Sequence, residues 1–321
     1  MQLLPRSARR AIRRRRLVRD ERMVPPAPFV VGHGRSGTTL LRLMLDAHPE
    51  LVIPPETQFL PQLIQVSKEP GATADGVCDV LVGHRRWEDF GIEADELRAR
   101  WRTIEPFDLR EGVRIFYGLY ADRFDKPRWG DKSPGYGWNM PPIDKLLPEA
   151  RFIHLIRDGR DVTLSLLAKH DDAPPPAQQA KHWIKRVKQT RKQGTRVRHY
   201  MEMHYEDLLE DPEKQLRRVC EFIDLEFDER MLRYHESAAE RISEIKRDMK
   251  GGQELTQDRS RGEVSGERRV EIHKLTSEPP RKDRIGKWRR EMDPGDLAEF
   301  ESVAGPMLTE LGYDLGSPSS G

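Results

Sequence analysis

The stretch over residues 29–45 constrains the fold of this chain more than any other. A short apolar run with β-branched residues, 29–32 (FVVG), indicates a buried strand. A glycine-rich turn follows over 32–37, and from Thr38 apolar residues return at helical spacing until the helix must stop before Pro49. A strand, a glycine-rich loop and a helix in this order favour phosphate binding, because the first backbone N–H groups of the helix face the loop.

Similar units recur along the chain. Strands are predicted at 152–156 and 200–205, and helices at 161–169, 212–225 and 293–311, the last with Asp293 as N-cap and Gly312 as its stop. Strands that alternate with helices predict an α/β fold of the P-loop type, with three layers and a central, mostly parallel sheet flanked by helices.

Two regions are less regular, and they complete the predicted organisation. Residues 67–128 have a mostly helical pattern and are expected to form a helical cap. Residues 244–283 are polar with little apolar periodicity, so a long polar loop is predicted there, either a lid or a disordered segment. The chain is therefore divided into a basic tail (1–26), one domain (27–315) and a short flexible tail (316–321).

The basic tail holds nine arginines against Asp20 and Glu21, whereas the whole chain has a net charge of only +2. No apolar segment follows the arginines, so no secretion signal is predicted, and no apolar run of membrane-spanning length exists. Cys78 and Cys220 lie too far apart for a disulfide framework. These features favour a cytoplasmic protein. The tail is either a solvated arm or a peripheral contact with anionic lipid, and no specific nucleic acid is expected.

The glycine-rich loop has the spacing of a nucleotide P-loop but lacks one of its residues. Gly32 and Gly37 are five positions apart, yet Thr38 stands where the P-loop lysine would contact the β- and γ-phosphates. This difference argues against an ordinary ATP or GTP phosphotransferase. Arg35, inside the loop, would instead suit a terminal anionic group.

The second strand–turn–helix unit suggests a second phosphate site. Arg157 closes the predicted strand, and Ser165 lies two helical turns further on. The two side chains could hold a phosphate from two sides, as a nucleotide with phosphates at both ends of its ribose would require. The alternative is a surface serine, with Arg157 paired to a carboxylate such as Asp161.

Four motifs in this order resemble the sulfotransferases that use 3′-phosphoadenosine-5′-phosphosulfate (PAPS), over nearly all of 29–314. They are GRSGTTLL at 34–41, LIRDGRD at 155–161 with Ser165, YEDL at 205–208 before Pro212, and RK-x-x-x-GKW at 281–288. The resemblance implies donor-binding roles for Gly34, Arg35, Ser36, Gly37, Thr38, Thr39, Arg157, Ser165, Tyr205, Arg281, Lys282, Lys287 and Trp288. Asp283 departs from the cytosolic branch, which has glycine there, and this weakens the assignment of Arg281 and Lys282.

The segments 45–50 (LDAHPE) and 55–57 (PET) resemble most the protein-tyrosine and bacterial branches of that family. The resemblance implies that Glu56 is the general base and that Lys132 lies near the bridging oxygen of the donor. Pro134 stands where the cytosolic branch has its histidine, which favours Glu56. Arg35 and Lys132 are expected to face the charge that develops on the leaving phosphate, and no metal is expected.

The predicted function is transfer of the sulfuryl group of PAPS to a hydroxyl by in-line displacement. Carbohydrate, lipid and small alcohols or phenols are placed ahead of peptide tyrosine as acceptors. The alternatives are a P-loop-type nucleotide or small-molecule kinase, and a non-catalytic protein that binds anions or nucleic acid through its tail. The sequence does not indicate an oligomeric state.

Overall fold

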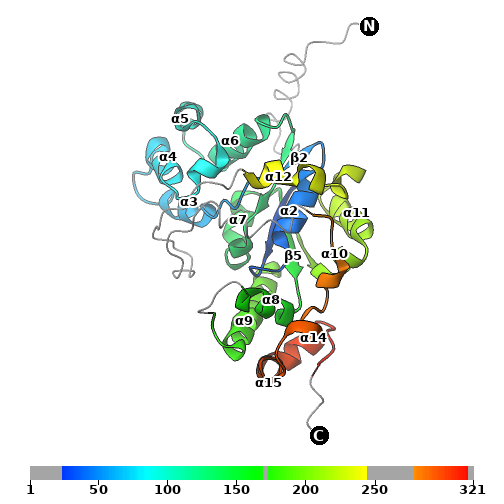
Figure 1. Cartoon of the computed structure of the whole chain (residues 1–321). Helices are drawn as coiled ribbons and strands as arrows, with labels where there is room; N and C mark the ends of the chain where they lie inside the picture. Colours follow the sequence, from blue (N-terminus) through cyan, green and yellow to red (C-terminus); the bar gives the residue numbers. More distant parts are fainter. Residues whose placement is uncertain (1–23, 169–172, 244–277, 317–321) are drawn as a thin grey trace, which may run out of the picture.

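The computed structural model describes residues 24–168, 173–243 and 278–316. Within them, the central sheet has four parallel strands in the order β4-β1-β5-β6 (Figure 1). A second parallel pair joins β2 to β3. The strands are β1 (Ala27–Gly32), β2 (Leu51–Val52), β3 (Arg128–Trp129), β4 (Asp131–Lys132), β5 (Ala150–Ile156) and β6 (Tyr200–His204). The predicted parallel sheet is confirmed.

Successive residues of β1 and β5 contribute to different cores, as the twofold period of a strand requires. Phe29 and Phe152 pack with helices of the first face, whereas Val30 and Ile153 pack with helices of the second. The first face is covered by α3 (Leu60–Val66), α6 (Leu109–Asp122), η3 (Pro134–Trp138) and α7 (Met140–Leu146). The second is covered by α2 (Thr38–Asp46), α10 (Tyr205–Glu210), α11 (Pro212–Phe222), η4 (Glu229–Met231) and α12 (His235–Ser243). These layers are those that the sequence predicts.

A third core lies beyond the carboxyl end of β5, where Ile156 meets Trp183 and Phe300. Its helices are α8 (Gly159–Leu167), α9 (Pro176–Gly194), α14 (Trp288–Glu291) and α15 (Pro294–Glu310), with η6 (Lys282–Arg284) just before α14. The Asp293 side chain accepts hydrogen bonds from the N–H groups of Gly295 and Asp296. Asp293 is therefore the N-cap that its position before Pro294 predicts.

The predicted helical cap over 67–128 is also helical in the structure. It contains α4 (Ala74–Val82), η2 (Trp87–Phe90), α5 (Ala94–Trp101) and α6, which Figure 1 shows together at one side of the sheet. Their apolar side chains join the first core.

Two predicted segments lie wholly or mostly outside the described residues: the arginine-rich tail, and the polar loop over 244–283. Lipid contact of the tail, the cytoplasmic location and the division of the chain therefore stay predictions. Within the described residues, no helix is long and apolar enough to cross a membrane.

Candidate active site

The glycine-rich loop leads from β1 into α2 and depends on two glycines. Gly37 has φ 87°, and a Cβ there would lie 2.3 Å from the Tyr205 ring. A Cβ on Gly32 would lie 2.5 Å from the Leu155 carbonyl oxygen. Gly37 is the N-cap of α2, no side chain caps this end, and the first turn holds no acidic residue. The first N–H groups of α2 therefore offer an anion a place at the loop.

Two polar atoms beside this loop support that interpretation. Among the described residues, the Ser36 hydroxyl and the Arg157 Nε are buried without a hydrogen-bond partner. Buried polar atoms are nearly always paired, because an unmade hydrogen bond costs free energy. One phosphate at the loop would supply an acceptor to Ser36, and a second phosphate beside Arg157 would supply one to its Nε, so the residues present fit a group with two phosphates.

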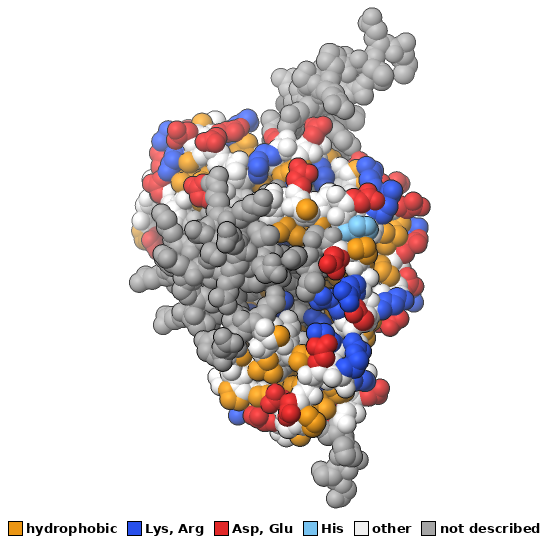
Figure 2. Space-filling model, viewed as in Figure 1, with side chains coloured by type: hydrophobic (Ala, Val, Ile, Leu, Met, Phe, Trp, Pro, Cys, Tyr) orange, Lys and Arg blue, Asp and Glu red, His pale blue; other side chains and the backbone are white. Residues whose placement is uncertain are grey.

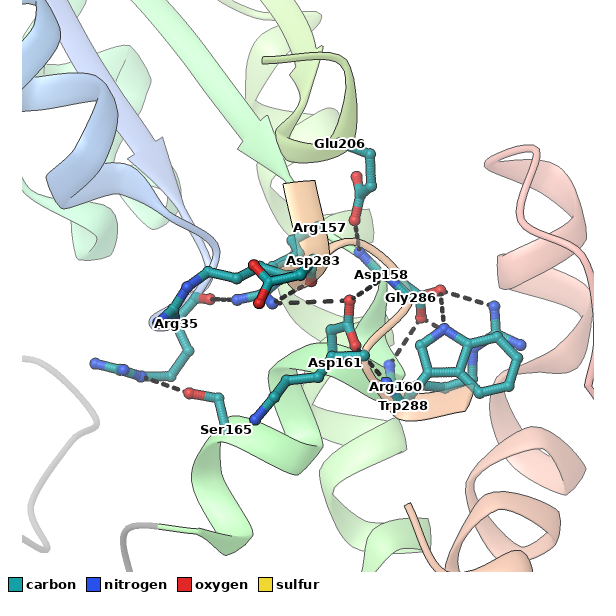
Figure 3. A network of polar contacts seen from close by, with 12 residues as sticks. Arg35, Arg157, Asp158, Arg160, Asp161, Ser165, Glu206, Asp283, Gly286 and Trp288 are labelled. Atoms are coloured by element: carbon teal, nitrogen blue, oxygen red, sulfur yellow. Dashed lines mark hydrogen bonds and ion pairs between the residues drawn. The ribbon is translucent and has the colours of Figure 1, made fainter. Parts of the chain in front are cut away.

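The loop and the second strand–turn–helix unit meet directly (Figure 3). Arg35, in left-handed conformation with φ 72°, donates through Nε to the Ser165 hydroxyl on α8 over 3.2 Å. Arg157, at the end of β5, donates to the Arg35 carbonyl over 3.2 Å and lies 3.7 Å from Asp161. The structure thus gives Arg157 the carboxylate of the alternative, whereas Ser165, its predicted partner at a phosphate, is hydrogen-bonded to Arg35.

Two consecutive residues of α10 brace this side of the site. The Tyr205 ring packs against Gly37, and the Arg157 guanidinium lies 4.5 Å from the centre of that ring. Glu206 accepts hydrogen bonds from the Asp158 backbone N–H and from the Tyr313 hydroxyl, each over 3.0 Å. Burial raises the pKa of Glu206 to about 7. Glu206 therefore holds the turn that follows Arg157.

Glu56 and Lys132 lie together at the start of α2. Lys132 Nζ lies 2.8 Å from Glu56 Oε1 and 3.4 Å from Thr39 Oγ1, in the first turn of the helix. Lys132 is buried, which lowers its pKa, although the Glu56 carboxylate opposes that shift. The structure thus places a carboxylate and a cation side by side at the phosphate loop.

The sequence does not single out the residues that hold Glu56. Gln58 Nε2 donates to Glu56 Oε2 over 2.7 Å, and Arg86 donates to the same oxygen over 3.3 Å. The Thr57 hydroxyl donates to the Asp131 carboxylate over 2.6 Å, and burial raises the Asp131 pKa to about 6. The only available signal is adjacency, since Thr57 and Asp131 are the sequence neighbours of Glu56 and Lys132.

The C-terminal motif lies on the surface around η6 and α14, where Figure 2 shows basic and acidic side chains intermixed. The structure pairs three of its cations with nearby carboxylates: Arg281 with Asp283 at 2.5 Å, Lys282 with Glu210 at 3.9 Å, and Lys287 with Glu291 at 2.6 Å. Each of these pairs is well exposed to solvent. The donor-binding role of the three cations stays a prediction.

Trp288, the last residue of the C-terminal motif, is packed inside the protein. Its ring is only 3% exposed and lies against the guanidinium of Arg160, 3.6 Å from the ring centre. Its indole N–H donates to Asp158, and its backbone N–H, like that of Gly286, donates to Asp161 (Figure 3). The Trp288 ring thus anchors this segment to α8, and its donor-binding role stays a prediction.

Comparison with known proteins identifies the family. The model described as "Sulfotransferase family" matches residues 26–229. Protein-tyrosine sulfotransferase A of Caenorhabditis elegans is 26% identical over 296 residues, which cover 90% of this chain and 67% of that protein. A putative protein-tyrosine sulfotransferase of Caenorhabditis briggsae is 26% identical over 297 residues, with 90% and 89% covered.

Solved structures agree on the fold. The sulfotransferase domain from the curacin biosynthetic pathway has a TM-score of 0.58 at 20% identity, covering 91% of this chain and 99% of that domain. The family match spans both strand–turn–helix units and the Glu56–Lys132 pair, whereas the motif over 281–288 lies beyond it. The resemblance and the α/β fold are confirmed, and the kinase alternative is set aside. The chain belongs to the sulfotransferase family.

Proposed function

We propose that this protein transfers the sulfuryl group of PAPS to a hydroxyl acceptor, with Glu56 as the general base. The observation that carries the proposal is a pair of contacts made by Lys132, whose Nζ lies 2.8 Å from Glu56 Oε1 and 3.4 Å from Thr39 Oγ1. A proton acceptor and a cation are thereby next to each other at a phosphate-binding helix end, as a displacement at a phosphosulfate requires.

The donor would be held by the two strand–turn–helix units. The loop over 34–39 and the N-terminus of α2 would bind its 5′-phosphate. Arg157 and Ser165 would bind its 3′-phosphate. The unpartnered Ser36 hydroxyl and Arg157 Nε support this assignment among the described residues.

The bound donor supplies an activated sulfuryl group with a good leaving group, and the protein supplies position and charge. As the acceptor oxygen forms its bond to sulfur, its proton passes to a Glu56 carboxylate oxygen. The bond between sulfur and the 5′-phosphate oxygen breaks, and its electron pair stays on that oxygen. Lys132 and Arg35 offset the developing negative charge. Metal-independent transfer stays a prediction.

For the acceptor, the relatives change the order in which candidates are tested. The two relatives described above are a protein-tyrosine sulfotransferase and a putative one, so peptide tyrosine becomes the first acceptor to try. A phenol, with a pKa of about 10, also yields its proton to a carboxylate more readily than an aliphatic alcohol does. Carbohydrate, lipid and small alcohols are the other acceptors to be tested in the same assay.

The test has a binding step and a turnover step. Thermal melts with 3′-phosphoadenosine-5′-phosphate (PAP), and separately with ATP and magnesium, should show stabilisation by PAP alone. Glu56→Gln should lower turnover with PAPS by about 10²–10⁴-fold and leave PAP affinity unchanged. Glu93→Gln, at an exposed residue before α5, is the matched control and should behave as wild type. Equal turnover in wild type and Glu56→Gln would reject Glu56 as the base.

A further inference from the structure

Gln58 has an unusual backbone conformation directly beside the proposed base. Among the described residues, it is one of four non-glycine residues with positive φ, at 58°. Such a conformation is unfavourable for a residue with a Cβ and persists where neighbours impose it. Here the backbone N–H groups of Thr57 and Gln58 both lie within hydrogen-bond distance of the Ser133 hydroxyl, at 3.1 and 3.4 Å.

The Gln58 side chain bridges a cation and the proposed base. Its Nε2 donates to Glu56 Oε2 over 2.7 Å, and its Oε1 accepts from Arg86 Nε over 3.1 Å. A guanidinium only donates hydrogen bonds and a carboxylate only accepts them, so a single orientation of the carboxamide satisfies both neighbours. Arg85 contacts the same Oε1 at 3.5 Å. The amide is therefore fixed from both ends.

We propose that Gln58 is a positioning residue, whose carboxamide, oriented by Arg86, holds the Glu56 carboxylate in place for proton abstraction. The proposal rests on the proposed function, since it needs Glu56 as the base. A backbone held by Ser133 and an amide held by Arg86 leave the Gln58 N–H₂ group aimed at Oε2. That arrangement lowers the freedom of the carboxylate before the acceptor arrives.

The same contact also predicts a pH effect. Among the described residues, charged groups that face Glu56 include Lys132 from β4 and Arg86 from the segment before η2, and Arg86 also pairs with Asp89 at 3.8 Å. Arg42, from α2, acts on Lys132. All of these remain when Gln58 is replaced. Because an amide donor favours the ionised carboxylate, its removal should move the acidic limb of the pH–rate profile to higher pH.

The test replaces the amide and keeps the length of the side chain. Gln58→Met has the same unbranched reach and meets the same left-handed backbone, but it donates no hydrogen bond. Turnover with PAPS should fall about 10–100-fold, with PAP affinity within about twofold of wild type. Gln65→Met, on the exposed side of α3, is the matched control and should change neither. Gln58→Asn tolerates the backbone but is one methylene shorter, so it should lose turnover as Gln58→Met does.

Wild-type turnover and an unmoved acidic limb in Gln58→Met would overturn the proposal. The proposal would also be overturned if both Gln58 variants lost melting temperature and PAP affinity together with turnover, because a merely structural role predicts that joint loss. If the proposed function itself is wrong, the wild type will show no transfer, or the wild type and Glu56→Gln will have equal turnover. If Glu56→Gln loses turnover and Gln58→Met keeps wild-type turnover, only the role of Gln58 is rejected.

Discussion

The phosphate loop and the Glu56 turn lie next to each other but are positioned by different means. The loop over 34–39 is shaped by its own backbone, through the positive φ of Arg35 and Gly37 and the end of α2. The turn over 56–58 is held by Ser133, Asp131 and Tyr136, which lie 74 to 79 positions further along the chain. The backbone of the loop is therefore set locally, although Arg157 and Ser165 reach the donor side from 122 and 130 positions beyond Arg35. Placement of the base depends instead on contacts with the first face of the sheet.

The largest effect is expected where the two regions touch, at Lys132. Lys132→Met leaves Glu56 with its contacts to Gln58 and Arg86 but removes the cation beside Thr39. Turnover with PAPS should fall about 10²–10³-fold, because one preorganised charge at the leaving group is lost, while PAP affinity falls less than tenfold. Single-turnover rates and PAP titrations separate the two quantities. A loss confined to PAP affinity would make Lys132 part of the donor site alone.

Gly37 tests whether the loop needs its left-handed backbone and its close approach to Tyr205. Gly37→Ala forces a Cβ into the Tyr205 ring at φ 87°, so we expect the free energy of unfolding to fall by about 1–3 kcal/mol. PAP affinity should fall with it. Gly118→Ala is the matched control, because a Cβ on that residue of α6 meets nothing within 4 Å, and it should stabilise by up to about 1 kcal/mol. Equal melting temperatures for the two variants would contradict this account.

The same contrast explains what could be predicted from the sequence. The strand–loop–helix unit and the Asp293 cap are signalled by neighbouring residues, so their positions are correct within a few residues. Glu56 and Lys132 are recognisable through motifs, but their contact is not, because it requires β4 to lie beside β1. Gln58 and Arg86 carry no motif: Gln58 is next to Glu56 in the turn, and Arg86 joins the site only through packing of the helical cap.

Trp288 is the opposite case, a residue that belongs to a motif but whose contacts the sequence does not predict. A tryptophan after a glycine and a lysine is compatible with donor contact as well as with packing, and the sequence does not show which residues it packs against. In the structure those residues are Arg160 and Asp158, which lie about 130 positions earlier in a different motif. Sequence spacing contains no information on that pairing.

Glu206 gives a pH-dependent effect on stability that is comparable in size to that of Gly37→Ala. Burial raises its pKa in the folded protein to about 7, above its ordinary value near 4.5. Its contribution to stability is thus complete below about pH 4.5 and is lost as the pH rises through 7. Between pH 5 and 8, wild type should lose up to roughly 3 kcal/mol that Glu206→Gln does not lose, since the amide cannot ionise. Urea unfolding of both proteins at several pH values measures the difference, and parallel pH curves would contradict the shifted pKa.

The smallest effects are expected at the C-terminal cations. Measuring these effects shows whether the donor site extends beyond the two strand–turn–helix units. Arg281 and Lys282 form exposed pairs with Asp283 and Glu210, and exposed pairs contribute roughly 0–1 kcal/mol. If these pairs persist when the donor binds, alanine at either position should leave PAP affinity within about threefold of wild type; a larger loss would support the donor-binding role that the resemblance implies. Arg157→Ala should weaken PAP by about 10–100-fold, because charge-assisted hydrogen bonds at a buried site are lost. If Arg281→Ala matched Arg157→Ala in PAP titrations, the surface segment around η6 would have to turn toward the loop when donor binds. Donor binding would then depend on a third segment, besides the loop and the unit around Arg157.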